Sequence, residues 1–227
     1  MNRYLVPGVV GAATVAIVAT MPLATPAAAA EFAVDAGVTR VFLDFENVLS
    51  PLGINLVTAS EDALANGMGE FQVGFDITDD TDFMFDDGLT APMGTIRHTG
   101  SVTLDIGGTE VTVGDFDIGR RDGGGIFVRD TLTTGAILFD FEPTSAASDE
   151  SSLALNGDLL VSPEFSGLLS ELLADPTLAP ALTGAAVGRA QVDADLVGGA
   201  ASVPEPLGLV GMMLAGTGAI ASRRWLR

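Results

Sequence analysis

The sequence predicts a mainly β fold, an antiparallel β-sandwich or open barrel with one short helix near its C-terminal end. Strand-like alternation of apolar and polar residues recurs between residues 31 and 202. A Gly107-Gly108 pair separates two such alternating runs, as in a β-hairpin. An uncharged apolar stretch close to the end of the chain predicts a separate C-terminal transmembrane helix.

Five segments favour strands by composition or by alternation. Residues 38–45, 136–141, 153–161 and 186–196 are rich in β-branched, aliphatic or aromatic side chains. Residues 70–77 alternate most cleanly, with Phe71, Val73, Phe75 and Ile77 on one face.

The glycine pair predicts a two-residue hairpin loop, because primed turns need positive φ angles. Closing that loop pairs Leu104 with Val111 and Val102 with Val113 on one face of the hairpin. The alternation of both strands is consistent with this register, so we expect it in the structure.

The last third of the domain is expected to contain a loop and a helix as well as strands. Residues 143–152 are polar and small, which favours a linker or a long loop. Ser162-Pro163-Glu164 then predicts the start of a helix, with Ser162 as the N-cap and Pro163 in the first turn. Asp175-Pro176 is expected to end that helix, and residues 153–197 are expected to complete the same domain.

The N-terminal residues 1–30 are typical of a secretory signal peptide. Arg3 supplies the positive charge, an apolar run follows at 9–19, and small residues including Ala28 and Ala30 precede the expected cleavage before Glu31. The alternative is an uncleaved membrane anchor, for which the apolar run is short.

The mature body, residues 31–202, is expected to be an acidic extracellular domain. It holds 29 acidic residues and six arginines, a net charge of −23, and the chain has neither Cys nor Lys. Such a charge argues against nucleic acid as a partner, because phosphate binding needs clustered cations. The absence of Cys excludes disulfides and thiol catalysis.

The C-terminal residues combine three features. Val203-Pro204-Glu205-Pro206 precedes an uncharged stretch of 15 residues, 207–221, and an arginine cluster follows it. A helix of that length spans ~22 Å of a hydrocarbon core ~30 Å thick, so it suits transient residence in a membrane. The arginines are expected to stay in the cytoplasm.

This tail, residues 203–227, resembles the PEP-CTERM sorting tail of bacteria that make exopolysaccharide. The resemblance implies recognition by an exosortase-like membrane enzyme, cleavage near Pro204 to Pro206, and delivery to the cell surface or extracellular matrix. An ordinary tail anchor is the alternative. The residues that carry the resemblance are Val203, Pro204, Glu205, Pro206, Arg223 and Arg224.

A cluster of carboxylates is the strongest candidate for a ligand site. Calcium is the hard cation that such oxygen ligands suit outside the cell, although the spacing is not that of an EF-hand. The alternative is a solvated acidic loop in an acidic protein. The candidate calcium ligands are Asp76, Asp79, Asp80, Asp82, Asp86 and Asp87.

Two other features are weaker candidates. His98 is the single histidine, and without a second His or a Cys it does not form a typical zinc site. We expect a strand residue that faces solvent or bonds to a neighbour. The glycines at 123–125 predict a flexible hairpin tip, with Arg120 and Arg121 paired to nearby aspartates.

Residues 96–104 and 113–118 resemble the haem-transport-associated domains of bacterial surface proteins. The resemblance implies a β-rich fold. The sequence offers no aromatic ligand set for haem, because residues 31–202 contain neither Tyr nor Trp.

These observations predict a non-enzymatic protein of the cell surface or extracellular matrix. Signal peptidase and an exosortase-like enzyme are its expected processing partners, and exopolysaccharide is a further candidate partner. The alternatives are a calcium-dependent adhesion or binding module and, third, a secreted hydrolase. No catalytic residue and no cofactor other than calcium are predicted.

Overall fold

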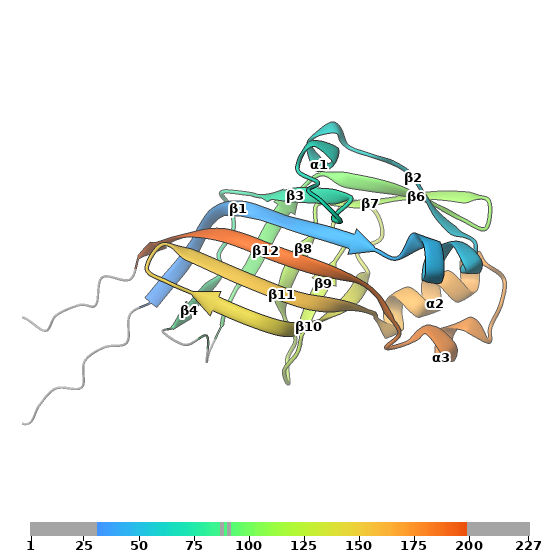
Figure 1. Cartoon of the computed structure of the whole chain (residues 1–227). Helices are drawn as coiled ribbons and strands as arrows, with labels where there is room; N and C mark the ends of the chain where they lie inside the picture. The colour runs from blue at the N-terminus through green and yellow to red at the C-terminus, as the bar shows by residue number, and fades with distance from the viewer. Residues whose placement is uncertain (1–30, 87–88, 90–91, 199–227) are drawn as a thin grey trace, which may run out of the picture. The chain divides into compact units, whose positions relative to one another are not determined.

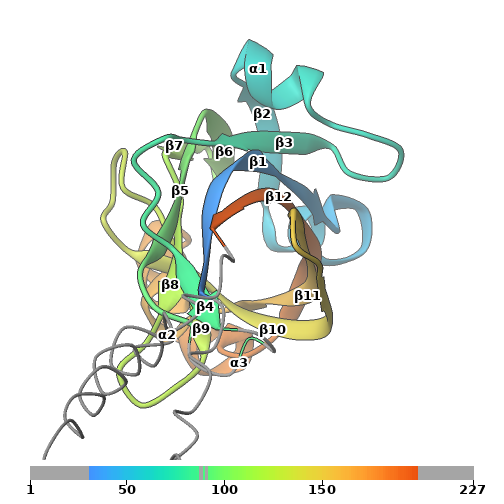
Figure 2. The same ribbon diagram turned by 90° about the vertical axis from the view of Figure 1, so that its left-hand side faces the viewer.

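Eight antiparallel strands form a closed barrel in the computed structural model, which describes residues 31–86, 89 and 92–198 (Figures 1 and 2). Each strand pairs with the next around the barrel, and β12 returns to pair with β1. The short β4 (Met84–Asp86) adds to the start of β1. In order around the barrel, the strands are β1 (Glu31–Leu43), β3 (Val73–Ile77), β5 (Thr95–Thr99), β8 (Asp117–Arg120), β9 (Ile126–Arg129), β10 (Ile137–Ser148), β11 (Ser152–Val161) and β12 (Ala186–Gly198).

The β1–β12 pairing is the seam that closes the barrel. It runs from Phe32 opposite Gly198 to Leu43 opposite Gly188, with an irregularity near residue 35. The two backbones approach so closely that a Cβ on Gly37 would lie 2.2 Å from the carbonyl oxygen of Asp193. The predicted mainly β, antiparallel fold is confirmed as a barrel. Because the seam leaves no free edge between these strands, the barrel is closed and not open, and the sandwich alternative was wrong.

A second, three-stranded sheet comprises β2 (Ile54–Ala59), β6 (Ser101–Ile106) and β7 (Thr109–Gly114). Strands β5–β6 and β7–β8 form one long hairpin that bends as it leaves the barrel. The bend lies at Gly100 and Asp115, where the Asp115 amide donates to the Gly100 carbonyl at 2.9 Å. The predicted register of the hairpin tip is confirmed, with Leu104 opposite Val111 and Val102 opposite Val113.

The helices gather mainly after β11. α2 (Pro163–Leu172) begins as predicted, since the Ser162 hydroxyl accepts a 3.0 Å hydrogen bond from the Phe165 amide. α2 and α3 (Leu178–Leu182) lie at the end of the barrel away from the start of β1 and the end of β12 (Figure 1). α3, α1 and two turns were not expected, because each has only three to five residues. α1 spans Glu61–Ala65, and the two turns are a π turn (Phe45–Leu49) and a 3₁₀ turn (Ser50–Leu52).

The expected linker at 143–152 was wrong, because residues up to Ser148 continue β10. These residues pair with β11, for example Ala146 opposite Leu155. The turn follows at Asp149, whose carboxylate accepts from the Ser151 and Ser152 amides at 2.8 Å. Backbone pairing with β11 therefore outweighs the turn-like local composition.

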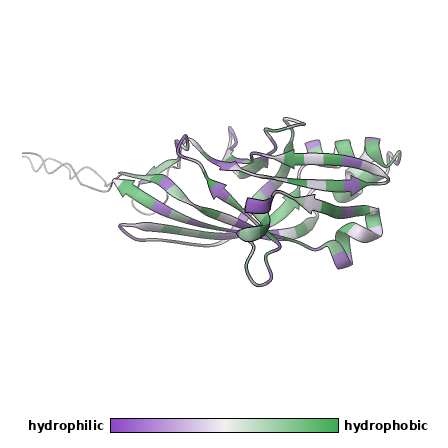
Figure 3. Ribbon diagram, turned by 90° about the horizontal axis from the view of Figure 1, so that it is seen from above, coloured by the Kyte–Doolittle hydropathy of each residue, from purple (hydrophilic) through white to green (hydrophobic). Residues whose placement is uncertain are grey.

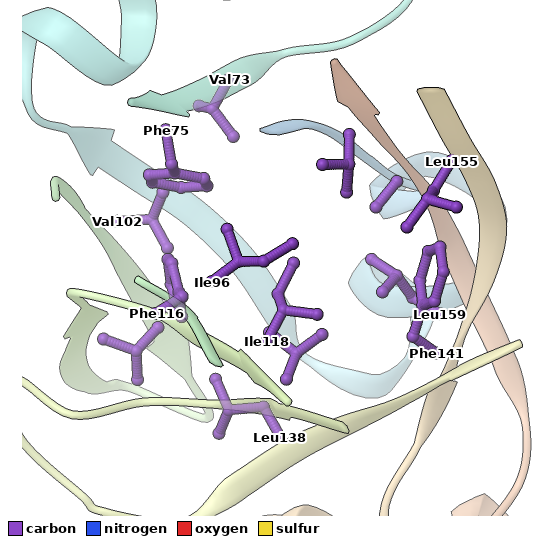
Figure 4. Close-up of a cluster of buried hydrophobic side chains, with 14 of the residues drawn as sticks. Val73, Phe75, Ile96, Val102, Phe116, Ile118, Leu138, Phe141, Leu155 and Leu159 are labelled. Carbon is purple, nitrogen blue, oxygen red and sulfur yellow. The ribbon is translucent and has the colours of Figure 1, made fainter. Parts of the chain in front are cut away.

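One apolar core fills the barrel and extends beneath the second sheet. Apolar and polar residues alternate along the strands (Figure 3), so that one face of each strand points inward. Phe75, Ile96, Phe116, Ile118 and Leu138 lie together in this core (Figure 4).

The predicted transmembrane helix falls at residues 207–221, outside the described residues. Within the described part of the chain, no helix is both long and apolar enough to cross a membrane.

Closure can be tested by substituting Gly37. Gly37→Ala is expected to lower the free energy of unfolding by at least ~2 kcal/mol, because the new methyl would meet the β12 backbone and the backbone φ of +138° is strained for alanine. Urea unfolding followed by circular dichroism measures the change.

Gly69→Ala is the matched control. Gly69 also has a positive φ, +62°, but nothing lies within 4 Å of an added Cβ. Equal losses for the two variants would show that backbone strain alone, and not the close approach of β1 and β12, sets the cost.

Candidate functional site

His98 lies inside the barrel, where its side chain is 4% exposed. Its Nδ1 lies 2.8 Å from the carbonyl oxygen of Phe116, and its Nε2 lies 2.7 Å from the Thr39 hydroxyl. A carbonyl oxygen only accepts, so Nδ1 carries the proton and Nε2 accepts from Thr39. Both nitrogens of the ring are therefore satisfied, and its tautomer is set by its neighbours.

Burial lowers the pKa of His98 to about 4, although the hydrogen bond to the Phe116 carbonyl raises it. The imidazole is therefore neutral at neutral pH. The expectation that this residue faces solvent was wrong, and the alternative of a bond to a neighbour is correct. Thr39 was missed, since it lies 59 residues from His98 and only the barrel brings the two together.

A small cavity adjoins His98. Its volume is about 60 Å³, well below the ~300–1,000 Å³ of most small-molecule sites. Since the Thr39 and His98 polar atoms already bond to each other or to the backbone, a water there would find few partners. The interior near His98 is thus a core with a small void, lined among others by Thr39, Phe75, His98, Phe116, Leu138 and Phe165.

The candidate calcium ligands at both ends of the acidic segment lie far apart. Asp76 on β3 lies opposite Val38, whereas Asp86 on β4 lies opposite Glu31, seven residues earlier on β1. At ~3.3 Å per residue, the two aspartates are about 23 Å apart along the strand. Asp76 instead accepts a 2.8 Å hydrogen bond from the Asn66 side chain.

Asp79, Asp80 and Asp82 lie in the turn between these strands. Arg97 forms an ion pair with Asp82 at 3.5 Å and donates to the backbone carbonyl of Asp80. The Thr95 amide donates to Asp82 at 2.8 Å. Asp87 lies outside the described residues, and among those described no three acidic or histidine side chains come close enough to hold a metal ion.

Asp117 on β8 faces the same turn. Burial raises its pKa, Arg97 and Arg129 lower it, and the charges of Asp80 and Asp82 raise it further, for a net rise. Carboxylates from two separate parts of the chain therefore act on one another beside Arg97.

The like-charged pair in the hairpin is also present, with Asp105 directly opposite Glu110. Asp105 accepts a 2.8 Å hydrogen bond from the Gly108 amide within the turn. This bond gives its carboxylate a partner without a bound cation.

The sorting and signal residues lie almost entirely outside the described residues. Glu31 begins β1 and pairs with Asp86 of β4. The expected cleavage residues Ala28 and Ala30 and the whole tail 203–227 are not described.

No family model matches the sequence, and no curated protein matches it. Among solved structures, the C-terminal domain of HtaA from Corynebacterium glutamicum aligns with 73% of this chain and 99% of its own. The TM-score is 0.45 and the identity is 12%. A likeness this distant assigns neither a family nor a function to the chain.

The buried histidine predicts a pH-dependent stability. The folded pKa of about 4 lies below the ordinary value of 6.5, so the unfolded chain takes up a proton first as the pH falls. Stability contributed by the neutral imidazole is therefore complete above pH 6.5 and is lost progressively down to about pH 4. An NMR titration follows the only imidazole of the chain, and a midpoint near 6.5 would contradict the buried, bonded state.

Thr39→Val removes the hydroxyl that bonds Nε2 and keeps the shape of the side chain. We expect a loss of about 1–3 kcal/mol in unfolding free energy, because a buried acceptor is left without a donor. Thr58→Val, at an exposed position of β2, is the control and is expected to change little.

Proposed function

We propose that this chain is an exported protein that an exosortase-like enzyme processes and leaves at the cell surface or in the extracellular matrix of an exopolysaccharide-producing bacterium, with a non-enzymatic role. The observation that carries the proposal is the sequence of the tail. A proline-rich motif, a short apolar stretch and an arginine cluster follow one another in residues 203–227, in a chain whose first 30 residues are typical of a signal peptide.

The barrel geometry supports this arrangement. β1 begins and β12 ends at the same end of the barrel, with Phe32 opposite Gly198 (Figure 1). Val203 follows Gly198 by five residues, which span at most ~18 Å. Cleavage at Pro204 to Pro206 would therefore leave at most eight residues of the chain after the end of β12.

The state of His98 argues against its use as a general base. A general base must reach a substrate proton through a free nitrogen. His98 is buried, neutral and bonded through both nitrogens, so it stabilises the fold.

The processing is tested by the intact mass of the protein from its native host and from a strain that lacks the exosortase. We expect the host form to end near Val203 to Pro206 and the mutant form to retain the arginine tail. If both forms keep Arg227, the tail is an ordinary anchor and the proposal fails.

A calcium-dependent binding role is the second candidate. Its basis is the repulsion of Asp117 by Asp80 and Asp82, which Ca²⁺ near this turn would reduce, although no three described carboxylates form a metal site. Millimolar Ca²⁺ is then expected to raise the melting temperature more than NaCl of matched ionic strength. Asp80→Asn should abolish that difference and Asp62→Asn, at an exposed position of α1, should not; equal effects of the two salts would contradict the role.

A further inference from the structure

Arginine is scarce in this domain, and most of its arginines have a carboxylate partner. Residues 31–198 contain six arginines and 29 acidic residues. The ion pairs are Arg40–Asp193, Arg97–Asp82, Arg121–Asp140 and Arg189–Glu70. Arg120 and Arg129 form no ion pair with a described residue, although carboxylates outnumber arginines more than fourfold.

These two arginines line the same surface pocket, of about 400 Å³. The pocket lies where β8 ends, β9 pairs with it and β10 begins. Its volume falls within the range of small-molecule sites, in contrast to the void beside His98. It is lined by Arg120, Arg121, Asp122, Phe127, Arg129 and Ile137.

Local strand geometry places the side chains there. Phe127 and Arg129 are two residues apart on β9 and share its outer face, whereas Val128 between them is buried in the core. The Phe127 ring lies over Gly119 of β8, where a Cβ would be 2.9 Å from the ring. A glycine at 119 therefore leaves room for the ring beside the pocket.

Arg129 is held in place without a salt bridge. Its guanidinium carbon lies 5.1 Å from the centre of the Phe127 ring, a cation–π contact. Its Nε is buried and has no hydrogen-bond partner among the described residues. Asp117 lies opposite Arg129 in the β8–β9 pairing, and the Arg129 charge lowers the pKa of its carboxyl, but the two side chains are too far apart to form an ion pair. An atom as buried as this Nε is not open to the pocket, so a ligand would contact the rest of the guanidinium, which lines the pocket.

Arg120 and Arg121 supply the other two positive charges at the pocket. Arg121 donates from Nε and Nη2 to one oxygen of Asp140, at 3.0 and 2.6 Å, and is therefore fixed in direction. Arg120 is exposed at the end of β8. Asp122, Asp140 and Asp117, which lies opposite Arg129, balance the three arginines, so the pocket is locally near neutral in a domain that is otherwise strongly acidic.

We propose that this pocket binds the oxyanion group of a small acidic ligand, a carboxylate, sulfate or phosphate, through Arg120 and Arg129. The planar guanidinium fork matches such groups, and charge-assisted hydrogen bonds of this type are the strongest that side chains form. The acidic surface elsewhere repels anions, but at 0.15 M salt the screening length is ~8 Å, so the nearby arginines dominate. The site lies on the barrel wall and does not depend on processing of the tail.

Arginine-selective NMR of the full chain tests the proposal directly. The sequence has ten arginines and no lysine, so ¹⁵N labelling of arginine gives at most ten Nε–H signals. Sodium galacturonate, phosphate and sulfate are titrated separately in 0.15 M NaCl, with galactose as the neutral control. We expect saturable shifts of the Arg120 and Arg129 signals with at least one anion and none with galactose.

Matched variants identify the residues. Arg120→Gln and Arg129→Gln are each expected to weaken binding about tenfold or more, because each removes a charged donor. Arg189→Gln is the control. Arg189 also stacks on a phenylalanine, with its guanidinium carbon 5.2 Å from the ring of Phe42, but it is paired with Glu70 and does not line the pocket.

The outcomes separate the sources of the anion. Tighter binding of galacturonate than of phosphate and sulfate identifies an acidic sugar or other organic acid as the ligand class, and comparable binding of all three identifies the free oxyanion. Absence of saturable shifts with every anion would overturn the proposal. So would an Arg189→Gln variant that loses as much affinity as Arg129→Gln.

Discussion

The pairing of β1 with β12 closes the barrel. It joins segments about 150 residues apart and turns a curved sheet into a closed barrel. Close backbone approach requires glycine at Gly37 and Gly188, and Arg40 reaches across the seam to Asp193 at 2.5 Å. Without this closure both strands would be exposed edges, and the inward face of β1 would lose its packing partners.

Closure of the barrel also sets the hydrogen bonds of the polar side chains in its interior. Thr39 on β1 enters the core and donates to His98 of β5, which in turn donates to the backbone of Phe116. This chain of hydrogen bonds satisfies the polar groups among apolar neighbours, where an unsatisfied nitrogen would be costly. The histidine thereby becomes part of the packing, and the chemistry available to ligands lies on the outer surface.

The many carboxylates of the outer surface find two kinds of partner. Carboxylates in turns accept from backbone amides or hydroxyls, as Asp82, Asp105 and Asp149 do. Arginines are placed singly among the acids, as Arg97 is beside Asp82. The pocket beside Phe127 departs from this pattern, because three arginines gather there and two of them, Arg120 and Arg129, form no ion pair with any residue that the structure describes. That departure distinguishes it from the rest of the surface.

Features that depend on near neighbours along the chain could be predicted from the sequence. The hairpin register at residues 102–113 follows from period-two alternation around a glycine pair, and the start of α2 follows from the Ser162 cap. The inward face of residues 71–77 follows from the same alternation. In each case the interacting groups are within about a dozen residues, so their pattern is visible in one segment.

The pairing of strands that are distant in the sequence could not be predicted in this way. Closure of the barrel, the continuation of β10 through residues 143–148, and the contact of Thr39 with His98 all depend on partners far apart in sequence. Asp130 is a further example: it is fully buried, and it accepts from the Gly114 amide at 2.8 Å as well as from its own loop. A local pattern states which side of a strand is apolar, but not which strand lies beside it, because that choice is made by the packing of the whole core.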